Sequence, residues 1–326
     1  MGSEMCKETG FMTKRKVPEL SLLSYVHGTQ ADKIKFVDDI FGGLKDYGFI
    51  ILKDHTVEQK KIDRAYELVK EFFDLPLETK IKYKGNNGGQ RGYTPFKTEH
   101  AKDNKNPDLK EFWHVGRELA ATSAYKGVYP ENVWPTEVAE LKKTFIELYE
   151  AMDTTSVTLL EAIGKGLDVP SDYFSNMIHD GNSIVRMIHY PPTKGQDTKN
   201  SIRAAAHEDI NLITMLVGAT DSGLQLLERD GTWLDVESRP GEIVVDTGDM
   251  MSRITNNVLP STTHRVINPS DDGSARFSMP FFVHPHSNAM LKCIPSCESA
   301  GGRTPQPEIT AGDFLTQRLR EIGLIK

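Results

Sequence analysis

Three residues in the second half of the chain have the types and the spacing of a metal site. His207 and Asp209 flank a single residue, and His264 follows much later. On an extended segment, residues i and i+2 point to the same face, so His207 and Asp209 can reach one metal ion, and a third ligand must come from a strand that folds back alongside. Two histidines and one carboxylate on one face of an octahedral Fe(II) leave the opposite face free for a chelating co-substrate and O2. The pattern therefore predicts a non-haem iron site.

Each part of this pattern carries little weight when taken alone. A histidine and an aspartate separated by one residue occur often by chance, and a single histidine such as His264 is more often a surface or core residue than a ligand. The three residues are followed by Arg276-Phe277-Ser278, and all of them lie in order within strand-like sequence. This conjunction favours a metal site over chance.

Two other groups of metal-binding residue types fit a metal site less well. His284 and His286 are close in sequence, but Pro285 kinks the chain between them and no carboxylate accompanies them. Cys293 and Cys297 resemble half of a zinc site, whereas structural zinc needs four ligands. We expect neither group to bind a metal, and we expect the two cysteines to be free thiols.

Several phrases between Ile184 and Phe282 resemble the isopenicillin N synthase-like family of Fe(II)/2-oxoglutarate-dependent oxygenases. In chain order, these phrases are Arg186–Pro192, Ala206–Thr214, Gly223–Leu226, Gly241–Asp249, Thr255–Asn257, His264–Val266 and Arg276–Ser278. The similarity extends to the beginning of the chain, where Val17–Leu20 and Gly48–Ile51 resemble the opening strands of the family. The resemblance therefore covers most of the chain.

This resemblance implies a site and a reaction. Fe(II) would be held by His207, Asp209 and His264, as the spacing also predicts. In the family, the far carboxylate of 2-oxoglutarate pairs with residues that correspond to Arg276 and Ser278, and a tyrosine that aligns with Tyr190 also contacts it. The implied reaction uses O2 to oxidise a C–H bond of a small-molecule substrate, most often by hydroxylation, and releases succinate and CO2.

Candidate substrate-binding residues come from the irregular stretch 84–108 and from the end of the resembling run. The segment Gln90–Thr94 resembles a family segment that approaches the substrate pocket, so Arg91 and Tyr93 are candidates, and Phe282 is a third. The alternatives are a surface ion pair for Arg91 and core packing for Tyr93.

The hydrophobic pattern divides the chain into a helical part and a strand-rich part. Helical spacing predicts helices over 32–47, 57–73, 137–167 and 311–322, with a short strand at 49–52. From Ser183 onwards the pattern indicates about eight short strands separated by turns, which is typical of a double-sheet jelly roll. We therefore expect a mixed α+β fold with a double-stranded β-helix (jelly-roll) core, an N-terminal helical layer and a C-terminal helix.

We expect one catalytic domain over residues 1–326, because this length suits a single large domain. Its parts would be a disordered leader (1–16), a helix-rich layer (17–180), the jelly-roll core with the metal site (181–285) and a C-terminal loop and helix (286–326).

Composition limits the partners that the protein can have. A net charge of −7 without a clustered basic face argues against nucleic-acid binding. No apolar run is long enough to span a membrane. Three cysteines, Cys6, Cys293 and Cys297, are too few for a disulfide framework, so a reducing compartment, the cytoplasm, is expected. The oligomeric state cannot be read from these features.

Two alternative functions remain at this point. The first is an oxidase like isopenicillin N synthase, in which Arg276 and Ser278 would hold the carboxylate of the substrate itself and no 2-oxoglutarate would be used. That enzyme carries a glutamine close to its C-terminus, and residues 322–326 contain none. The second alternative is a non-catalytic jelly-roll binding protein, which would have no need of all three iron ligands together with Arg276 and Ser278.

Overall fold

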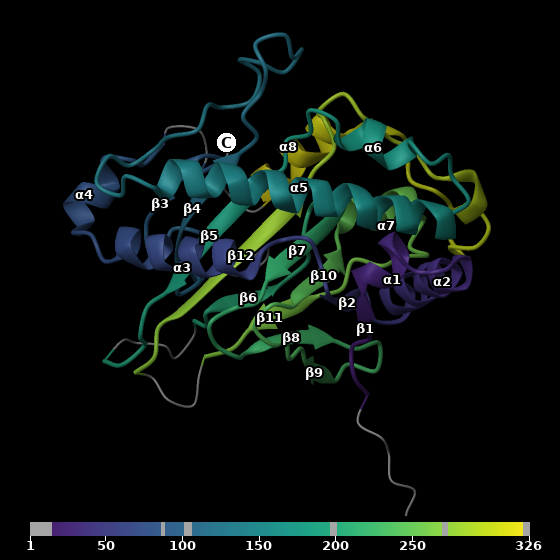
Figure 1. The fold of residues 1–326 in the computed structure, drawn as a ribbon, viewed down its shortest axis with the longest axis horizontal. Helices are drawn as coiled ribbons and strands as arrows, with labels where there is room; N and C mark the ends of the chain where they lie inside the picture. Colours follow the sequence, from purple (N-terminus) through teal and green to yellow (C-terminus); the bar gives the residue numbers. More distant parts are fainter. Residues whose placement is uncertain (1–14, 86–88, 101–105, 196–200, 269–272, 322–326) are drawn as a thin grey trace, which may run out of the picture.

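Two β-sheets form the centre of the protein (Figure 1). The computed structural model describes residues 15–85, 89–100, 106–195, 201–268 and 273–321. Most of the predicted leader over 1–16 and the last residues, 322–326, lie outside these ranges. The larger sheet has the strand order β1-β2-β10-β7-β12-β5-β4-β3, and the smaller one has the order β6-β11-β8-β9.

The strands of the larger sheet come from both halves of the chain. They are β1 (Glu19–Ser21), β2 (Phe49–Lys53), β3 (Gly92–Thr94), β4 (Glu111–Gly116), β5 (Ile184–Tyr190), β7 (Ile213–Val217), β10 (Ile243–Thr247) and β12 (Arg276–Val283). The smaller sheet consists of β6 (Ala204–His207), β8 (Leu224–Leu227), β9 (Trp233–Asp235) and β11 (His264–Val266). A short pair, β13 (Met290–Leu291) and β14 (Ile309–Thr310), follows them.

Alternating side chains of the larger sheet serve two separate apolar cores. In β10, Ile243 and Val245 belong to the core beneath the helices, whereas Val244 belongs to the core between the two sheets. This follows from the two-residue period of a strand, which points neighbouring side chains to opposite faces. The inner core is completed by residues of the smaller sheet such as Leu226 and Val266. The two sheets therefore pack face to face as the predicted jelly roll.

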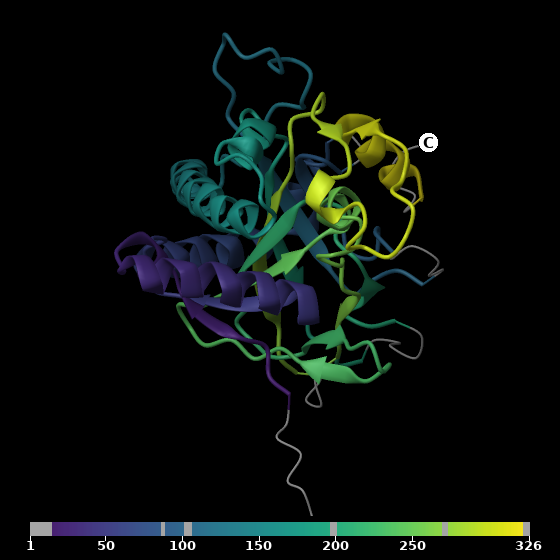
Figure 2. The same cartoon turned by 90° about the vertical axis from the view of Figure 1, so that its right-hand side faces the viewer.

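Helices of the N-terminal layer cover the outer face of the larger sheet (Figures 1 and 2). Over all of the described residues, the α-helices are α1 (Leu22–Val26), α2 (Gln30–Tyr47), α3 (Gln59–Phe73), α4 (Leu77–Ile81), α5 (Leu141–Gly166), α6 (Tyr173–Ile178), α7 (Asp249–Ile254) and α8 (Ala311–Glu321), of which α1 to α6 belong to the N-terminal layer. Figure 2 shows α8, in yellow, on the opposite side of the larger sheet from α2, α3 and α5. None of the helices that the structure describes is long and apolar enough to cross a membrane.

The four long helices predicted from periodicity are confirmed, with shifted ends. Helix α2 begins two residues earlier than predicted because Thr29 and Asp32 form a capping box, in which each side chain accepts a hydrogen bond from the backbone of the other. Helix α5 begins later than predicted, at Leu141. Helix α7 was not predicted, because it is a short segment directly after β10 in which four of six side chains are buried.

Gly48, at the end of α2, packs against Thr262, two residues before His264. It ends α2 in the left-handed conformation, with φ +69°, and its N–H donates to Leu44. A Cβ at this position would lie 2.1 Å from the side-chain oxygen of Thr262, whose carbonyl is hydrogen-bonded to His264. Only glycine fits both the backbone conformation and the available space.

We expect Gly48→Ala to lower the free energy of unfolding by about 1–2 kcal/mol, because a Cβ is disfavoured in the left-handed region and Thr262 must move. Gly42→Ala in the same helix is the matched control, since its new Cβ has nothing within 4 Å. This control should stabilise the protein by about 0.5–1 kcal/mol. Urea denaturation of both variants and the parent protein measures the difference. Unchanged stability of Gly48→Ala would contradict this account.

Candidate active site

The pairing of β6 with β11 brings the three predicted iron ligands together. His207 and His264 are direct partners in this antiparallel pair, and their ring centroids are 4.4 Å apart. Oδ1 of Asp209 lies 3.7 Å from Nε2 of His207 and 3.9 Å from Nε2 of His264. The ligand atoms of all three residues lie within 4.8 Å of one another. Such atoms can converge on one metal ion.

Hydrogen bonds to the backbone set the tautomers of both histidines. Nδ1 of His207 lies 2.8 Å from the carbonyl oxygen of Ala205, and Nδ1 of His264 lies 3.1 Å from that of Thr262. Because a carbonyl oxygen only accepts, each Nδ1 carries the proton, and each Nε2 keeps its lone pair for a metal. Burial, together with the neighbouring His264, lowers the pKa of His207 to about 4, so its imidazole is neutral at neutral pH.

A short relay of hydrogen bonds orients Asp209. The hydroxyl of Thr214 donates to Oδ2 of Asp209, which leaves Oδ1 facing the histidines. The amide of Asn211 in turn donates to Thr214 Oγ1 at 3.0 Å and to the carbonyl of Ile213 at 3.0 Å. A Cβ on Gly248 would lie 2.4 Å from the carbonyl oxygen of Asn211, so this close packing requires glycine there. Thr214 lies in one of the resembling phrases, but sequence reasoning gave it no role.

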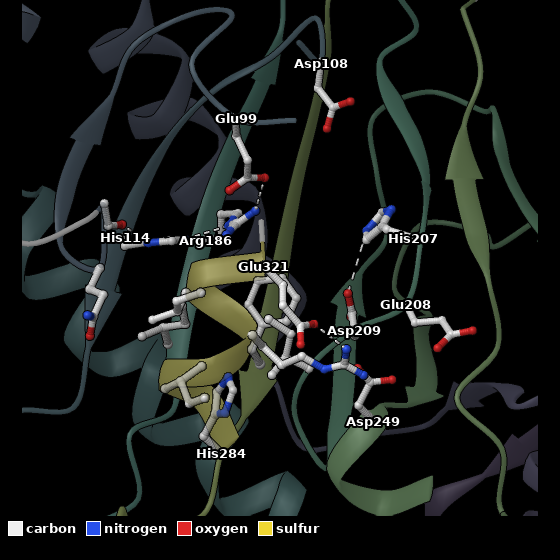
Figure 3. Close-up of a pocket in the computed structure, with 18 of the residues that line it drawn as sticks. Glu99, Asp108, His114, Arg186, His207, Glu208, Asp209, Asp249, His284 and Glu321 are labelled. Atoms are coloured by element: carbon white, nitrogen blue, oxygen red, sulfur yellow. Dashed lines mark hydrogen bonds and ion pairs between the residues drawn. The ribbon is translucent and has the colours of Figure 1, made fainter. Parts of the chain in front are cut away.

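A cavity of about 380 Å³ opens beside these residues (Figure 3). The N-terminal layer contributes Glu99, Asp108, Lys110 and His114 to its wall, and the jelly roll contributes Arg186 and Phe282. Figure 3 shows Arg186 and Glu99 on one side, His207 and Asp209 on the other, and the final helix between them.

Buried ion pairs stabilise one wall of this cavity. Nζ of Lys110 lies 2.7 Å from Glu99 and 2.9 Å from Asp108, and Arg186 lies 3.1 Å from the same oxygen of Glu99. The two cations hold the pKa of Glu99 well below its usual range despite its burial. Nε of Arg186 also donates to Nε2 of His114 at 2.6 Å. Nε2 of His114 therefore accepts a hydrogen bond, and His114 is part of the cavity wall and not one of the three iron ligands.

Of the three predicted substrate-binding residues, Arg91, Tyr93 and Phe282, the structure places two in the cavity wall and one in the core. Arg91 and Phe282 line the cavity. Tyr93 does not: it is 1% exposed in the core beneath the helices, and its hydroxyl donates to Glu111. Residues 91 and 93 would share a face only on a regular strand, whereas Gly92 between them has φ +75°. Core packing, the alternative for Tyr93, is what the structure shows, and Arg91 is buried, not on the surface.

A second group consists of Arg276, Ser278 and Tyr190, none of which is among the residues that line this cavity. Arg276 and Tyr190 are partners in the pairing of β12 with β5, and the guanidinium lies 5.1 Å from the ring centroid of Tyr190. Nε of Arg276 donates to the carbonyl of Asp221, whereas Nη1 is buried and has no hydrogen-bond partner among the described residues. Because such an N–H is costly to leave unpaired, this group fits an anion such as the far carboxylate of 2-oxoglutarate.

The final helix supplies cavity residues that sequence reasoning missed. Leu315, Arg318 and Leu319 of α8 line the cavity. Arg318 lies 2.8 Å from Asp249, a residue just after β10 whose pKa burial raises to about 6 despite this cation. His284, which the sequence analysis set aside as a metal ligand, also lines the cavity. The amphipathic pattern of α8 predicts a helix, but it does not tell where that helix docks.

Two parts of the chain match known families of one enzyme class. Residues 17–137 match the family described as "non-haem dioxygenase in morphine synthesis N-terminal", and residues 181–285 match the "2OG-Fe(II) oxygenase superfamily". A 2-oxoglutarate-Fe(II) type oxidoreductase of Emericella nidulans, hxnY, is 33% identical over 91% of this chain and 88% of its own length. A 1-aminocyclopropane-1-carboxylate oxidase of Dictyostelium discoideum is 27% identical over 90% of this chain and 88% of its own.

Solved structures of the same enzyme class are also similar to this chain. A 2OG-Fe(II) oxygenase family protein from Caulobacter crescentus is 43% identical, with a TM-score of 0.85 over 94% of this chain and 99% of its own. A full-length Neurospora crassa protein in complex with alpha-KG and thymine is 25% identical, with a TM-score of 0.82 over 93% of this chain and 96% of its own. The chain therefore belongs to the isopenicillin N synthase-like family of 2-oxoglutarate- and Fe(II)-dependent oxygenases, as its sequence motifs predict.

Proposed function

We propose that His207, Asp209 and His264 hold the iron of a 2-oxoglutarate-dependent dioxygenase that hydroxylates a small polar molecule in the adjoining cavity. That the chain is a dioxygenase of this class, with Fe(II), 2-oxoglutarate and O2, follows from its family. The convergence of the three ligand atoms within 4.8 Å carries the assignment of the iron ligands. When bound, Fe(II) activates O2, 2-oxoglutarate is converted to succinate and CO2, and one oxygen atom enters a C–H bond of the substrate.

The chain's own residues prepare this reaction by fixing protons and charges. The two imidazoles present unprotonated Nε2 atoms, and Thr214 holds Asp209 so that one oxygen faces them. Arg276 would fork onto the far carboxylate of 2-oxoglutarate, since a guanidinium binds a carboxylate in a bidentate manner. Ser278, two residues further along β12, shares its face and would add a hydroxyl donor.

The cavity favours a small and polar substrate. Its wall contains cations, carboxylates and histidines from three parts of the chain, and Phe282 is its one aromatic hydrocarbon side chain among the described residues. The relatives agree on size, because the Neurospora crassa structure contains thymine and the Dictyostelium relative is named for 1-aminocyclopropane-1-carboxylate.

We also infer one catalytic domain with the predicted parts, and a reducing compartment such as the cytoplasm. The larger of the two apolar cores, the one beneath the helices, includes Leu44 of the N-terminal layer, Met215 of the jelly roll and Phe314 of the final helix, which supports one domain. Cys293 and Cys297 are buried free thiols, which supports a reducing environment.

Removal of a metal ligand tests the iron assignment. We expect His207→Ala and Asp209→Ala each to abolish stoichiometric Fe(II) binding, because two remaining ligands cannot complete the site. His286→Ala is the control, since His286 lies against Tyr125 and does not line the cavity. Anaerobic equilibrium dialysis gives the iron content, and circular dichroism verifies folding. Full iron occupancy in a folded His207→Ala protein would refute the assignment.

The orientation of Asp209 can be tested without removing it. Thr214→Val keeps the shape of the side chain but loses the donor to Asp209, so we expect the Kd for Fe(II) to rise by about 10- to 100-fold. Thr214→Ser retains the hydroxyl and should bind iron as the parent protein does. Equal iron affinities for the valine and serine variants would show that the relay has no effect on the site.

The role of Arg276 is tested by titrating 2-oxoglutarate into the anaerobic Fe(II) protein and following the visible charge-transfer band. We expect Arg276→Gln to raise the Kd for 2-oxoglutarate at least tenfold, or about 1.4 kcal/mol, without changing iron affinity. Arg253→Gln is the control, because Arg253 bonds to Gln306 and Pro307 instead. An unchanged Kd in Arg276→Gln would favour the oxidase in which this arginine holds the substrate.

A further inference from the structure

We propose that Arg203 is a second cation of the 2-oxoglutarate site, which acts together with Arg276 on the far carboxylate of the co-substrate. Arg203 lies outside the segment Arg276–Ser278 and immediately before β6 of the smaller sheet. The proposal rests on the proposed function, because it adds a residue to the co-substrate site assigned there.

Hydrogen bonds hold the side chain of Arg203 next to that of Arg276. Nη1 of Arg203 donates to Oδ2 of Asp221 at 3.1 Å, and Nε of Arg276 donates to the carbonyl oxygen of the same residue at 3.2 Å. Nη2 of Arg203 donates at 2.8 Å to the carbonyl oxygen of Ser274, two residues before Arg276. The two guanidinium groups therefore share Asp221 as a partner and lie close together at the beginning of β12.

Each of these two guanidinium groups has a buried nitrogen without a partner. Arg203 and Arg276 are each 1% exposed. Nε of Arg203 and Nη1 of Arg276 are buried and have no hydrogen-bond partner among the described residues. A buried N–H without an acceptor is costly, and a carboxylate offers two oxygens with several lone pairs. One bound carboxylate can therefore accept hydrogen bonds from both arginines.

Two buried cations share one carboxylate at this place. Within the described ranges, Asp221 is the one acidic residue that forms an ion pair with Arg203, and its side chain is 33% exposed, so water screens its charge. Burial lowers the pKa of Arg203, the hydrogen bond to Asp221 partly offsets this, and the nearby charge of Arg276 lowers the pKa further. Because an arginine still stays ionised at neutral pH, a second carboxylate would be stabilised here.

The backbone of Arg203 belongs to the sheet that carries the iron ligands. Its N–H donates to Oδ1 of Asn268 at 3.0 Å, just beyond the end of β11. Four residues after Arg203, His207 of β6 pairs with His264 of β11. Arg276, in contrast, begins β12 of the larger sheet. A co-substrate that joins the iron to Arg276 would span the same two sheets that the side chain of Arg203 connects.

A purely structural role for Arg203 differs from this proposal in one measurable quantity. An arginine that only ties the two sheets together would affect the binding of every oxoacid to the same extent. A second cation at the far end of the site would instead strengthen the binding of an oxoacid that carries a far carboxylate. The ratio of the Kd values for a charged and an uncharged oxoacid therefore separates the two roles.

Titration of two oxoacids into the anaerobic Fe(II) protein, followed by the visible charge-transfer band, tests the role of Arg203. 2-Oxovalerate has the chelating end and the chain length of 2-oxoglutarate, but it lacks the far carboxylate. We expect Arg203→Gln to raise the Kd for 2-oxoglutarate at least tenfold and to leave the Kd for 2-oxovalerate unchanged. Arg203→Lys keeps the charge but loses the planar fork, so its preference for 2-oxoglutarate should lie between those of the parent protein and of Arg203→Gln.

Arg117→Gln is the matched control, because it removes an arginine from a partly buried ion pair, that with Asp153, outside the co-substrate group. It should leave both Kd values unchanged, and circular dichroism verifies folding. A preference equal to that of the parent protein in either folded Arg203 variant, or an equal rise of both Kd values, would overturn the proposal. If the parent protein itself gives no band with 2-oxoglutarate, the proposed function fails, and the role of Arg203 fails with it.

Discussion

The active site depends on the antiparallel pairing of β6 with β11. This register sets His207 opposite His264, and a slip by one residue would turn one of the two imidazoles to the other face of the sheet. The register is held from the other side as well, because β11 also pairs with β8, and Phe49 of the larger sheet packs edge-on against His264. The metal group is therefore a product of sheet geometry and not of a local loop.

Buried polar groups around the site divide into two kinds. Some that shape the wall are ion-paired, such as Lys110 between Glu99 and Asp108, and these pairs make the wall rigid because each charge would be costly to leave unpaired. Others are buried without a hydrogen-bond partner among the described residues, and Nη1 of Arg276 and Nδ1 of His284 are two of them. Nη1 of Arg276 lies where we place the far carboxylate of the co-substrate.

The sequence predicts the jelly roll, the four long helices and the convergence of His207, Asp209 and His264. Each of these features depends on a hydrophobic period or a residue spacing that can be read from the sequence alone. It leaves Tyr93 open between the substrate pocket and the core, since the left-handed turn at Gly92, which breaks the strand period, cannot be seen in the sequence pattern. It does not predict that Arg318 and His284 line the cavity, because local periodicity does not indicate where α8 docks or which distant segments lie close together.

Gly92 has a wider consequence for how this enzyme can diversify. Because the backbone turns there, Tyr93 packs in the core while Arg91, two positions away, lies in the cavity wall. A mutation at position 91 can therefore alter the chemistry presented to a ligand without disturbing the aromatic packing of Tyr93 against Phe72. Selection for new substrates and selection for a stable core can act on adjacent positions almost independently, and this segment is where we expect related enzymes to diverge in specificity.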